Sequence, residues 1–277
     1  MRGSRRLHDQ FNHLQSPQVV GESRDIQLLT LRPQITNPCQ LQISTAMEMP
    51  DLLTVLHVLI SLLASYLSML CFSNPNPDPN TTSAVSDRII PFASFEFLLV
   101  RRVSILIIGI NHALLILNPT APNYLICPST SSLNLSLFTW TRYSAICLAL
   151  ILIFAPIRLL AFAQLGKNFT FKLAKPQNLV TTGLYAYMQH PSYTANSVVA
   201  TAHLMLFERP DGLAGCWMSE SVAKSPWWGV VGLVLVAVVV HLGRQRVVDE
   251  EDMLKKAFGK EWEVWHQKTK RFVPWVI

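Results

Sequence analysis

The sequence predicts an all-α integral membrane protein, a bundle of about five transmembrane helices. Half of the 277 residues are hydrophobic and only 14% are charged, whereas a typical soluble domain carries about 25% charged residues. Several apolar runs reach the roughly 17–25 residues that a helix needs to cross a bilayer. A segment in lipid must also satisfy its own backbone hydrogen bonds, which excludes an open sheet. We therefore expect helices and no β-sheet core.

The chain begins with a polar stretch, residues 1–46, which contains three prolines and no apolar run long enough for a signal peptide. We expect this stretch to be a flexible tail. Residues 47–155 are expected to hold the N-terminal transmembrane helices, and residues 156–277 a separate functional region.

Five apolar runs are expected to cross the membrane. They are Leu52–Phe72, about Val103–Leu117, about Ser144–Ala163, Tyr193–Phe207 and Trp227–Leu242. Residues 73–91 are rich in Pro, Asn, Ser and Thr and should form a loop. Because Arg101 and Arg102 interrupt the second run, we place both at a cytosolic interface.

Basic residues orient the bundle, since cytosolic loops carry an excess of Lys and Arg. Such residues occur before the fourth run and after the fifth; they are Lys167, Lys172, Lys175, Arg244 and Arg246. The loop at residues 118–141 has no charge, and its Asn134-Leu135-Ser136 sequon suits a lumenal position. The sequence therefore predicts a multi-pass protein with a cytosolic C-terminus.

Composition also bears on partners and cofactors. The net charge of +6, without a nucleic-acid-binding motif, fits membrane loops better than a nucleic-acid partner. The five cysteines form no C-x-x-C pair, which argues against a disulfide scaffold and a structural zinc site. We expect no metal. Single histidines in the apolar runs, His57, His112 and His203, are expected to hydrogen-bond between packed helices.

The last hundred or so residues carry the first signs of chemistry. Pro191 pushes the backbone of His190 out of the helical region, and Gly183 permits a tight turn just upstream. Non-helical backbone at a membrane boundary is tolerated where it lines a wet cavity. Three tyrosines cluster here: Tyr185, Tyr187 and Tyr193. The stretch predicts either a site for an aromatic base with a ribose or an interfacial aromatic belt.

A second element follows the fifth run. Arg246 and Glu250 are four residues apart and so share one helix face. An arginine at the boundary can hold a carboxylate with its planar fork. Glu250 could accept hydrogen bonds from ribose hydroxyls or an amino group. The alternative is a solvated ion pair at the end of a span.

Together the two elements resemble the isoprenylcysteine carboxyl methyltransferase family, over about residues 156–277. The matching residues occur in order with family-like spacing. They are Arg158, Leu165-Gly166, Phe169-Thr170, Leu179-Val180, Gly183, Tyr185, His190-Pro191-Ser192-Tyr193, Arg246, Glu250-Glu251, Phe258-Gly259, Glu261-Trp262 and Pro274. One departure is Gln189, where the family usually has arginine, and losing that charge would weaken the electrostatics of the site.

The resemblance implies methyl transfer from S-adenosyl-L-methionine to the C-terminal carboxylate of a prenylated cysteine in CaaX-processed proteins, at the endoplasmic reticulum membrane. It implies that Arg246 holds the substrate carboxylate and serves as the catalytic residue. The cofactor contacts that it implies are Gln177, Asn178, Leu179, Val180, Tyr185, His190, Pro191, Ser192, Tyr193 and Glu250.

Other membrane proteins share parts of this pattern. Phospholipid N-methyltransferases have a similar cofactor half, but their nucleophile is an amine, for which a carboxylate-holding arginine is less useful. Membrane sterol reductases have a related His-Pro turn but differ in the acidic pair and the Phe-Gly pattern. The Gln189 departure also leaves open a catalytically weakened scaffold of the same fold.

Overall fold

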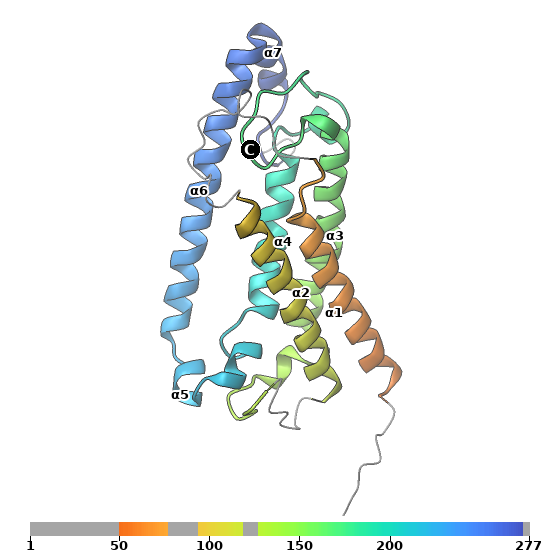
Figure 1. Ribbon diagram of the computed structural model, residues 1–277, viewed down its shortest axis with the longest axis vertical. Coiled ribbons are helices and arrows are strands. Elements are labelled where there is room, and N and C mark those ends of the chain that lie inside the picture. Colours follow the sequence, from red (N-terminus) through yellow and green to blue (C-terminus); the bar gives the residue numbers. More distant parts are fainter. Residues whose placement is uncertain (1–49, 77–93, 119–126, 274–277) are drawn as a thin grey trace, which may run out of the picture. The chain divides into compact units, whose positions relative to one another are not determined.

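The apolar runs fold into helices, as the computed structural model shows (Figure 1). The structure describes residues 50–76, 94–118 and 127–273, which all belong to one compact unit, Glu48–Ile277. The stretch expected to be a tail, residues 1–46, and the motif residue Pro274 lie outside the described residues.

Seven α-helices are described. They are α1 (Leu52–Cys71), α2 (Phe95–Leu117), α3 (Arg142–Leu165), α4 (Pro191–Phe207), α5 (Glu220–Ala223), α6 (Trp227–Phe258) and α7 (Lys260–Lys268). Short 3₁₀ turns connect them: η2 (Leu135–Leu137), η3 (Gly166–Asn168), η4 (Gly183–Ala186) and η5 (Leu213–Trp217). The described ranges contain no strand, and an isolated bridge pairs Met188 with Lys270. The predicted all-α class is confirmed.

Four of the described helices, α1, α2, α3 and α6, are long and apolar enough to cross a membrane. The fourth predicted span is the shorter helix α4, which has 17 residues and packs along α3. The boundary between residues 155 and 156, expected from the sequence, falls inside α3. That boundary therefore marks where the family resemblance starts and not a break in the fold.

Helices α1 to α4 enclose the main core. Leu148 and Ile151 of α3 meet Val199 and Leu206 of α4, all almost fully buried. Helix α2 approaches α1 so closely that a Cβ at Gly109 would lie 2.2 Å from the Ser65 Oγ. These contacts leave the start of α4 fixed at one end of the bundle.

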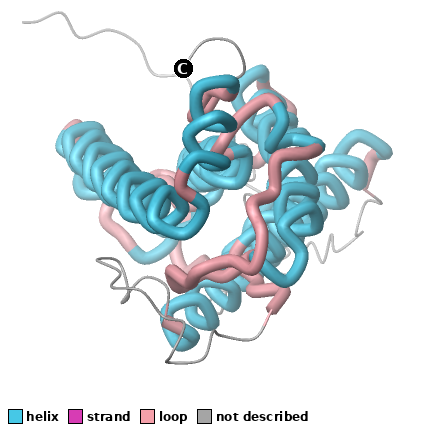
Figure 2. Tube along the Cα trace, turned by 90° about the horizontal axis from the view of Figure 1, so that it is seen from above, coloured by secondary structure: helices cyan, strands magenta, loops and turns pink. Residues whose placement is uncertain are grey.

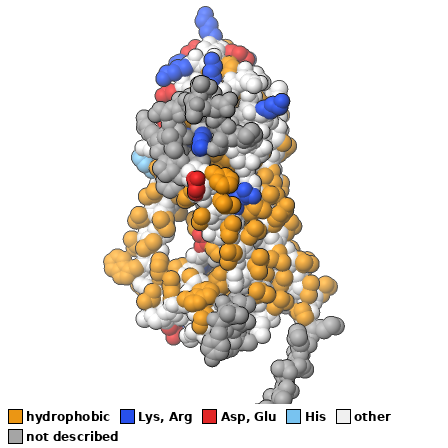
Figure 3. Space-filling model, viewed as in Figure 1, with side chains coloured by type: hydrophobic (Ala, Val, Ile, Leu, Met, Phe, Trp, Pro, Cys, Tyr) orange, Lys and Arg blue, Asp and Glu red, His pale blue; other side chains and the backbone are white. Residues whose placement is uncertain are grey.

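Helix α6 differs from the other long helices because its apolar half has no neighbour among the described elements. Every residue from 229 to 241 is exposed, on all sides of the helix. Figure 2 shows α6 beside the other helices rather than among them. Hydrophobic side chains cover the middle of the face drawn in Figure 3, and most Lys and Arg gather toward the upper end. Such a surface suits contact with lipid.

The two arginines of the second run do not precede its helix. Helix α2 begins at Phe95, so Arg101 and Arg102 lie inside it, and the predicted membrane part from about Val103 is the later portion of a longer helix. Arg101 Nη1 lies 2.7 Å from Glu208 Oε1, at the end of α4. An arginine inside an apolar helix needs such a partner, because an unpaired charge in lipid is costly.

The three span histidines are buried, but the hydrogen bonds between packed helices that were expected of them are not found among the described residues. His203 Nδ1 lies 3.0 Å from Glu208 Oε1, the residue that directly follows its own helix α4. His57 instead stacks on Trp140, with ring centroids 4.5 Å apart. His112 packs on two phenylalanine rings, and neither of its ring nitrogens has a partner among the described residues.

At the end away from the start of α4, a disulfide joins Cys127 to Cys216 across 89 residues. This disulfide ties the loop before α3 to η5, so the argument against disulfides from the cysteine spacing was wrong. Cys71 and Cys147 are free and buried, as predicted. In the nearby sequon, the Asn134 amide nitrogen donates to Asp211 Oδ2 at 3.0 Å.

Candidate active site

The candidate site forms where the start of α4 meets the second half of α6. His190 is non-helical (φ −125°, ψ 54°), and Pro191 occupies the first turn of α4, as the sequence predicted. Helix α6 does not end with its apolar part but continues to Phe258. This continuation carries Arg246 and Glu250 past the exposed stretch, and it brings them against α4.

Tyr193 links the two segments. Its hydroxyl donates to Glu250 Oε2 at 2.7 Å and accepts a hydrogen bond from Arg246 Nε at 3.2 Å. Arg246 Nη2 also donates to the backbone oxygen of Phe171 at 2.7 Å. Arg246 is therefore only 4% exposed, whereas the sequence placed it at a rim where its loss would leave little buried charge unpaired. That part of the expectation is wrong.

A second pair of contacts joins the same segments. His190 Nε2 lies 3.3 Å from Glu251 Oε1, and Arg271 Nε and Nη2 each lie 2.8 Å from a Glu251 oxygen. Burial opposes ionisation of Glu251, but the hydrogen bonds from His190 and Arg271 outweigh it and lower the pKa of Glu251 to about 2. Neighbouring carboxylates of α6 thus each bind one residue of the His190–Tyr193 turn.

Gln189 fastens the turn to the end of the chain. Its side-chain nitrogen donates to Thr269 O at 2.9 Å, and its side-chain oxygen lies 2.9 Å from His266 Nδ1. The backbone nitrogens of Gln189 and His190 donate to Lys270 O and Arg271 O. Gln189 is 4% exposed, and its side chain is engaged in these contacts. It therefore fastens the C-terminal segment to the turn and does not supply the charge of the arginine that the family usually has at this position.

The turn at η4 depends on Gly183, which has a φ of +63°. A Cβ there would lie 2.4 Å from the Gln164 side chain, whose oxygen accepts a hydrogen bond from Leu184 N at 2.9 Å. Tyr185 follows, buried against Ala161 of α3, and burial raises the pKa of its hydroxyl. Its backbone oxygen accepts a hydrogen bond from Trp265 Nε1 at 2.8 Å.

The other expected cofactor residues have different exposures. Gln177 and Asn178 are exposed, and Asn168 holds them: its side-chain oxygen accepts from Gln177 N and its nitrogen donates to Asn178 Oδ1, both at 2.9 Å. Leu179 and Val180 are half-buried beside the Tyr185 cluster. Pro191 and Ser192 are buried.

Ser192 is held by Arg158, which the sequence marked only as part of the family pattern. Arg158 Nη1 donates to both the backbone and hydroxyl oxygens of Ser192, each at 2.9 Å, and Nε donates to Cys71 O. The guanidinium also lies 4.6 Å from the centre of the Phe162 ring. Arg158 therefore joins three helices beneath the site.

Sequence reasoning missed several residues of this region. Arg271 lies 20 residues beyond Glu251, a separation that no short spacing rule covers, and Phe171 contributes only a backbone oxygen, which leaves no side-chain signal. Asn196 lies one helical turn after Tyr193, and its Oδ1 is buried without a partner among the described residues. A polar residue three positions after Tyr193 on a predicted helix could have been found.

The arrangement has the groups that a cofactor with hydroxyl and amino donors requires. Glu250 uses one oxygen for Tyr193, and its second oxygen accepts no hydrogen bond from a described residue. The orphaned Oδ1 of Asn196 is a further acceptor. The described ranges hold no group of three His, Cys, Asp or Glu side chains arranged for a metal.

Comparisons with known proteins point to one family. Residues 146–224 match the model of the isoprenylcysteine carboxyl methyltransferase (ICMT) family. A protein-S-isoprenylcysteine O-methyltransferase of Schizosaccharomyces pombe is 27% identical over 141 residues, 50% of this chain and 52% of the relative. One of Dictyostelium discoideum is 27% identical over 123 residues, 43% of this chain and 44% of the relative. The chain thus spans about half the length of these relatives. The resemblance found in the sequence is confirmed.

Proposed function

We propose that this chain transfers a methyl group from S-adenosyl-L-methionine to the C-terminal carboxylate of a prenylated cysteine, giving a methyl ester. The observation that carries the proposal is the contact of Arg246, Tyr193 and Glu250 at the point where the apolar part of α6 ends. A substrate with a long apolar chain and a small anionic head requires a cation at such a boundary. Both relatives carry the name of this activity.

The proposed roles follow from the contacts. Glu250, Asn196 and the Gln177–Val180 stretch would hold the cofactor, and His190, Pro191 and Ser192 would shape its pocket. Arg246 would orient the substrate carboxylate with its guanidinium. The orienting residue is itself fixed by hydrogen bonds, so little freedom is lost when the substrate binds.

The methyl transfer requires little of the protein beyond orientation of the reacting groups. When bound, S-adenosyl-L-methionine supplies an electrophilic methyl carbon, to which a carboxylate oxygen bonds as the carbon–sulfur bond breaks. A carboxylate is ionised at neutral pH, so no general base is required. Arg246 and the buried turn hold the reacting oxygen in line and exclude water. Tyr185 serves as a packing residue whose backbone is fixed by Trp265.

We also propose that the site faces the cytosol, at the endoplasmic reticulum membrane. The disulfide lies at the other end of the bundle, and disulfides persist in oxidising compartments such as the lumen. Near that end, Arg209 pairs with Asp211 and Lys224 with Glu220, so these charges are neutralised. The excess of Lys and Arg expected of cytosolic loops belongs to the site end, where Lys167, Lys172, Lys175 and Arg244 occur.

The proposed function is tested by giving membranes that contain the protein two acceptors, a farnesylated cysteine analogue and phospholipids with amine headgroups, together with radiolabelled S-adenosyl-L-methionine. We expect label in a base-labile ester of a farnesylated cysteine analogue. Label in the amine headgroups of phospholipids would favour the N-methyltransferase, which shares the cofactor half of the pattern. Transfer to neither acceptor would favour a scaffold without activity.

A further inference from the structure

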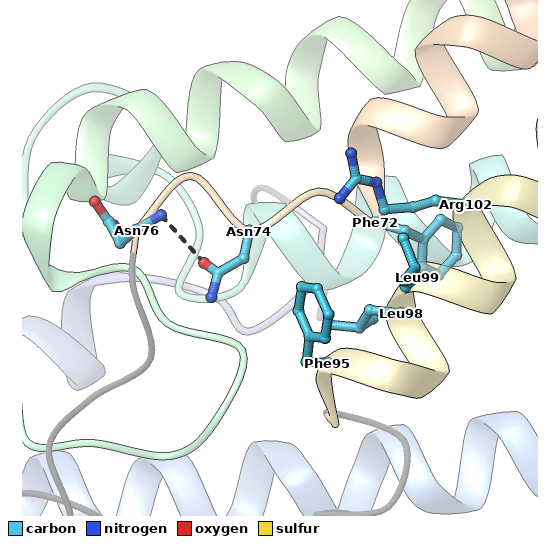
Figure 4. A pocket seen from close by; sticks show the side chains of 7 residues that line it. All are labelled: Phe72, Asn74, Asn76, Phe95, Leu98, Leu99 and Arg102. Atoms are coloured by element: carbon cyan, nitrogen blue, oxygen red, sulfur yellow. Dashed lines mark hydrogen bonds between the residues drawn. The ribbon is translucent and has the colours of Figure 1, made fainter.

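A cavity of about 240 Å³ lies outside the candidate active site, between the end of α1 and the start of α2 (Figure 4). One part of its wall is apolar and comes from Phe72, Phe95, Leu98 and Leu99. Asn74, Asn76 and Arg102 provide the polar part. None of these lining residues is acidic.

Arg102 is the cation of this cavity. Its Nε is buried and has no hydrogen-bond partner among the residues that the structure describes. In Figure 4 its guanidinium extends from α2 toward the segment that follows α1. The neighbouring Arg101 differs, because its guanidinium is paired with Glu208. Leaving this buried N–H without an acceptor is costly, which points to an anion that binds Arg102.

A second donor lines the same cavity. The Asn74 side-chain oxygen accepts a hydrogen bond from Asn76 N at 3.3 Å, which leaves the Asn74 amide nitrogen for another acceptor. Asn76 has a different role: its side-chain nitrogen donates to Gly166 O and Phe169 O at 2.7 and 2.8 Å. Asn76 thus fixes the 72–76 segment against the loop after α3, and the polar wall is held in place.

The apolar wall continues onto the outer surface of α2. Phe95 is 64% exposed, Leu99 42% and Val103 47%. The cavity is also smaller than the roughly 300–1,000 Å³ of sites that enclose a drug-sized ligand. It therefore suits a compact anionic group whose apolar chains remain outside, along this surface.

We propose that the cavity binds the phosphate group of an anionic phospholipid from the leaflet on the side of the active site. Arg102 and Asn74 donate hydrogen bonds to the phosphate oxygens, and the acyl chains lie along Phe95, Leu99 and Val103. An arginine holds a phosphate with two parallel hydrogen bonds, whereas an aliphatic wall selects against a free ion. This inference does not depend on the proposed methyl transfer.

Two other anions could compete for Arg102. The prenylcysteine carboxylate has the same combination of charge and chain, but Arg246 would hold it on α6. Within the chain, Asp78 and Asp87 belong to residues 77–93, between the two sides of the cavity in sequence. Neither has the two acyl chains that the exposed apolar surface of α2 would accommodate.

The test is native mass spectrometry of the purified full-length chain with dioleoyl phosphatidic acid, dioleoyl phosphatidylcholine or inorganic phosphate. We expect one retained phosphatidic acid, with Arg102→Gln weakening retention at least about tenfold because a charge-assisted hydrogen bond is lost. Arg244→Gln, which removes an exposed arginine at the same end, should bind as the wild type does. Leu99→Trp, which fills the cavity and keeps the charge, should also weaken retention.

Several results would overturn the proposal. Equal retention by wild type and Arg102→Gln means that Arg102 does not bind the lipid. Competition by inorganic phosphate at the same concentration means that the apolar wall is unused, and competition by a farnesylated cysteine analogue means that the cavity belongs to the substrate. Binding that appears only in an Asp78→Asn, Asp87→Asn double variant means that the chain's own carboxylates occupy the cavity.

Discussion

Arg246 is buried, and this changes what its substitution should do. Lysine is shorter and cannot hold both Tyr193 and Phe171 O while orienting a carboxylate. We expect Arg246→Lys to lower methyl transfer by about 10²-fold or more, since small displacements cost that much in an oriented reaction. Because Arg246 is buried, Arg246→Lys should also cause a moderate loss of thermal stability. Turnover with a prenylcysteine and a melting curve on the same preparation measure the two effects.

The control is Arg244→Lys, an exposed position two residues away that should keep both activity and stability. If Arg246→Lys melts earlier yet turns over at a near-native rate, Arg246 is a structural link between α6 and the loop at Phe171. The assignment as a carboxylate-holding residue would then be wrong.

Glu251 should give the protein a stability that depends on pH. Its pKa is about 2 in the folded chain, against an ordinary value of 4.5. A lowered pKa means that its contribution is complete above about pH 4.5 and is lost as the pH falls toward 2. We expect Glu251→Gln to cost on the order of 2 kcal/mol at pH 7, from hydrogen bonds to a charged group. The difference in free energy of unfolding between wild type and Glu251→Gln should narrow as the pH falls from 4.5 to 2.

The fluorescence of the nearby Trp262 and Trp265, both buried, can follow unfolding across this pH range. Glu261→Gln serves as the control because Glu261 is exposed on α7 and should change little. A gap between wild type and Glu251→Gln that stays constant from pH 7 to pH 2 would contradict the assigned pairing with His190 and Arg271.

At the scale of single residues, sequence patterns found the participants but not their partners. Spacing placed Arg246 and Glu250 on one face, and the structure adds that Tyr193 lies between them. His190 pairs with Glu251 rather than with its neighbour Glu250. Glu250 and Glu251 are adjacent on α6, and both lie close to the His190–Tyr193 turn. Which carboxylate binds which residue of the turn depends on side-chain rotations, which residue spacing does not predict.

Among the elements, the η4 turn depends most directly on one glycine. Gly183→Ala would place a Cβ at positive φ and against Gln164, which costs about 1–2 kcal/mol from the backbone alone. We expect a lower melting temperature, measured by the reactivity of the buried thiols of Cys71 and Cys147 on heating. Activity should fall as well, because the turn positions the stretch from Gly183 to His190.

Gly243→Ala is the matched change, since a Cβ there meets no atom within 4 Å in the middle of α6. It should be neutral or stabilise by about 0.5–1 kcal/mol, the usual helix preference for alanine. Equal destabilisation by both substitutions would mean that Gly183 has no special conformational role.

Helix boundaries show where sequence reasoning fails at this scale. Apolar runs located α1 and α3 within two residues at each end, because composition alone defines a span. Helix α2 extends beyond its predicted membrane part and includes Arg101, whose partner Glu208 is 107 residues away and has no signal in the local sequence. Helix α6 likewise continues past its apolar part, because the polar continuation keeps good helix formers such as Glu and Lys.

For the whole molecule, the orientation in the membrane can be tested with two exposed lysines at opposite ends. In sealed microsomes, Lys175→Cys should react with a membrane-impermeant maleimide. Lys224→Cys, beyond α4 and near the disulfide, should react only after the membrane is permeabilised. The reverse labelling pattern would place the site in the lumen and exclude cytosolic substrates.

The disulfide shows the limit of whole-chain prediction from sequence. Cys127 and Cys216 follow no spacing rule, and only the antiparallel packing of α3 and α4 brings their loops together. The meeting of the His190 turn with α6 could be predicted, because an apolar hairpin must return the chain to the membrane face from which it entered. Contacts between segments far apart in the sequence can thus be predicted where membrane crossing restricts the path of the chain. Without that restriction they cannot be predicted.

The central claim is that the chain methylates a carboxylate, and a pair of acceptors tests it most directly. The purified full-length chain in lipid nanodiscs is given labelled S-adenosyl-L-methionine and either an S-farnesylcysteine analogue with a free carboxylate or its carboxamide. We predict saturable transfer to the carboxylate, released as methanol by base, and none to the carboxamide. Transfer to neither acceptor, or equal transfer to both, would contradict the account.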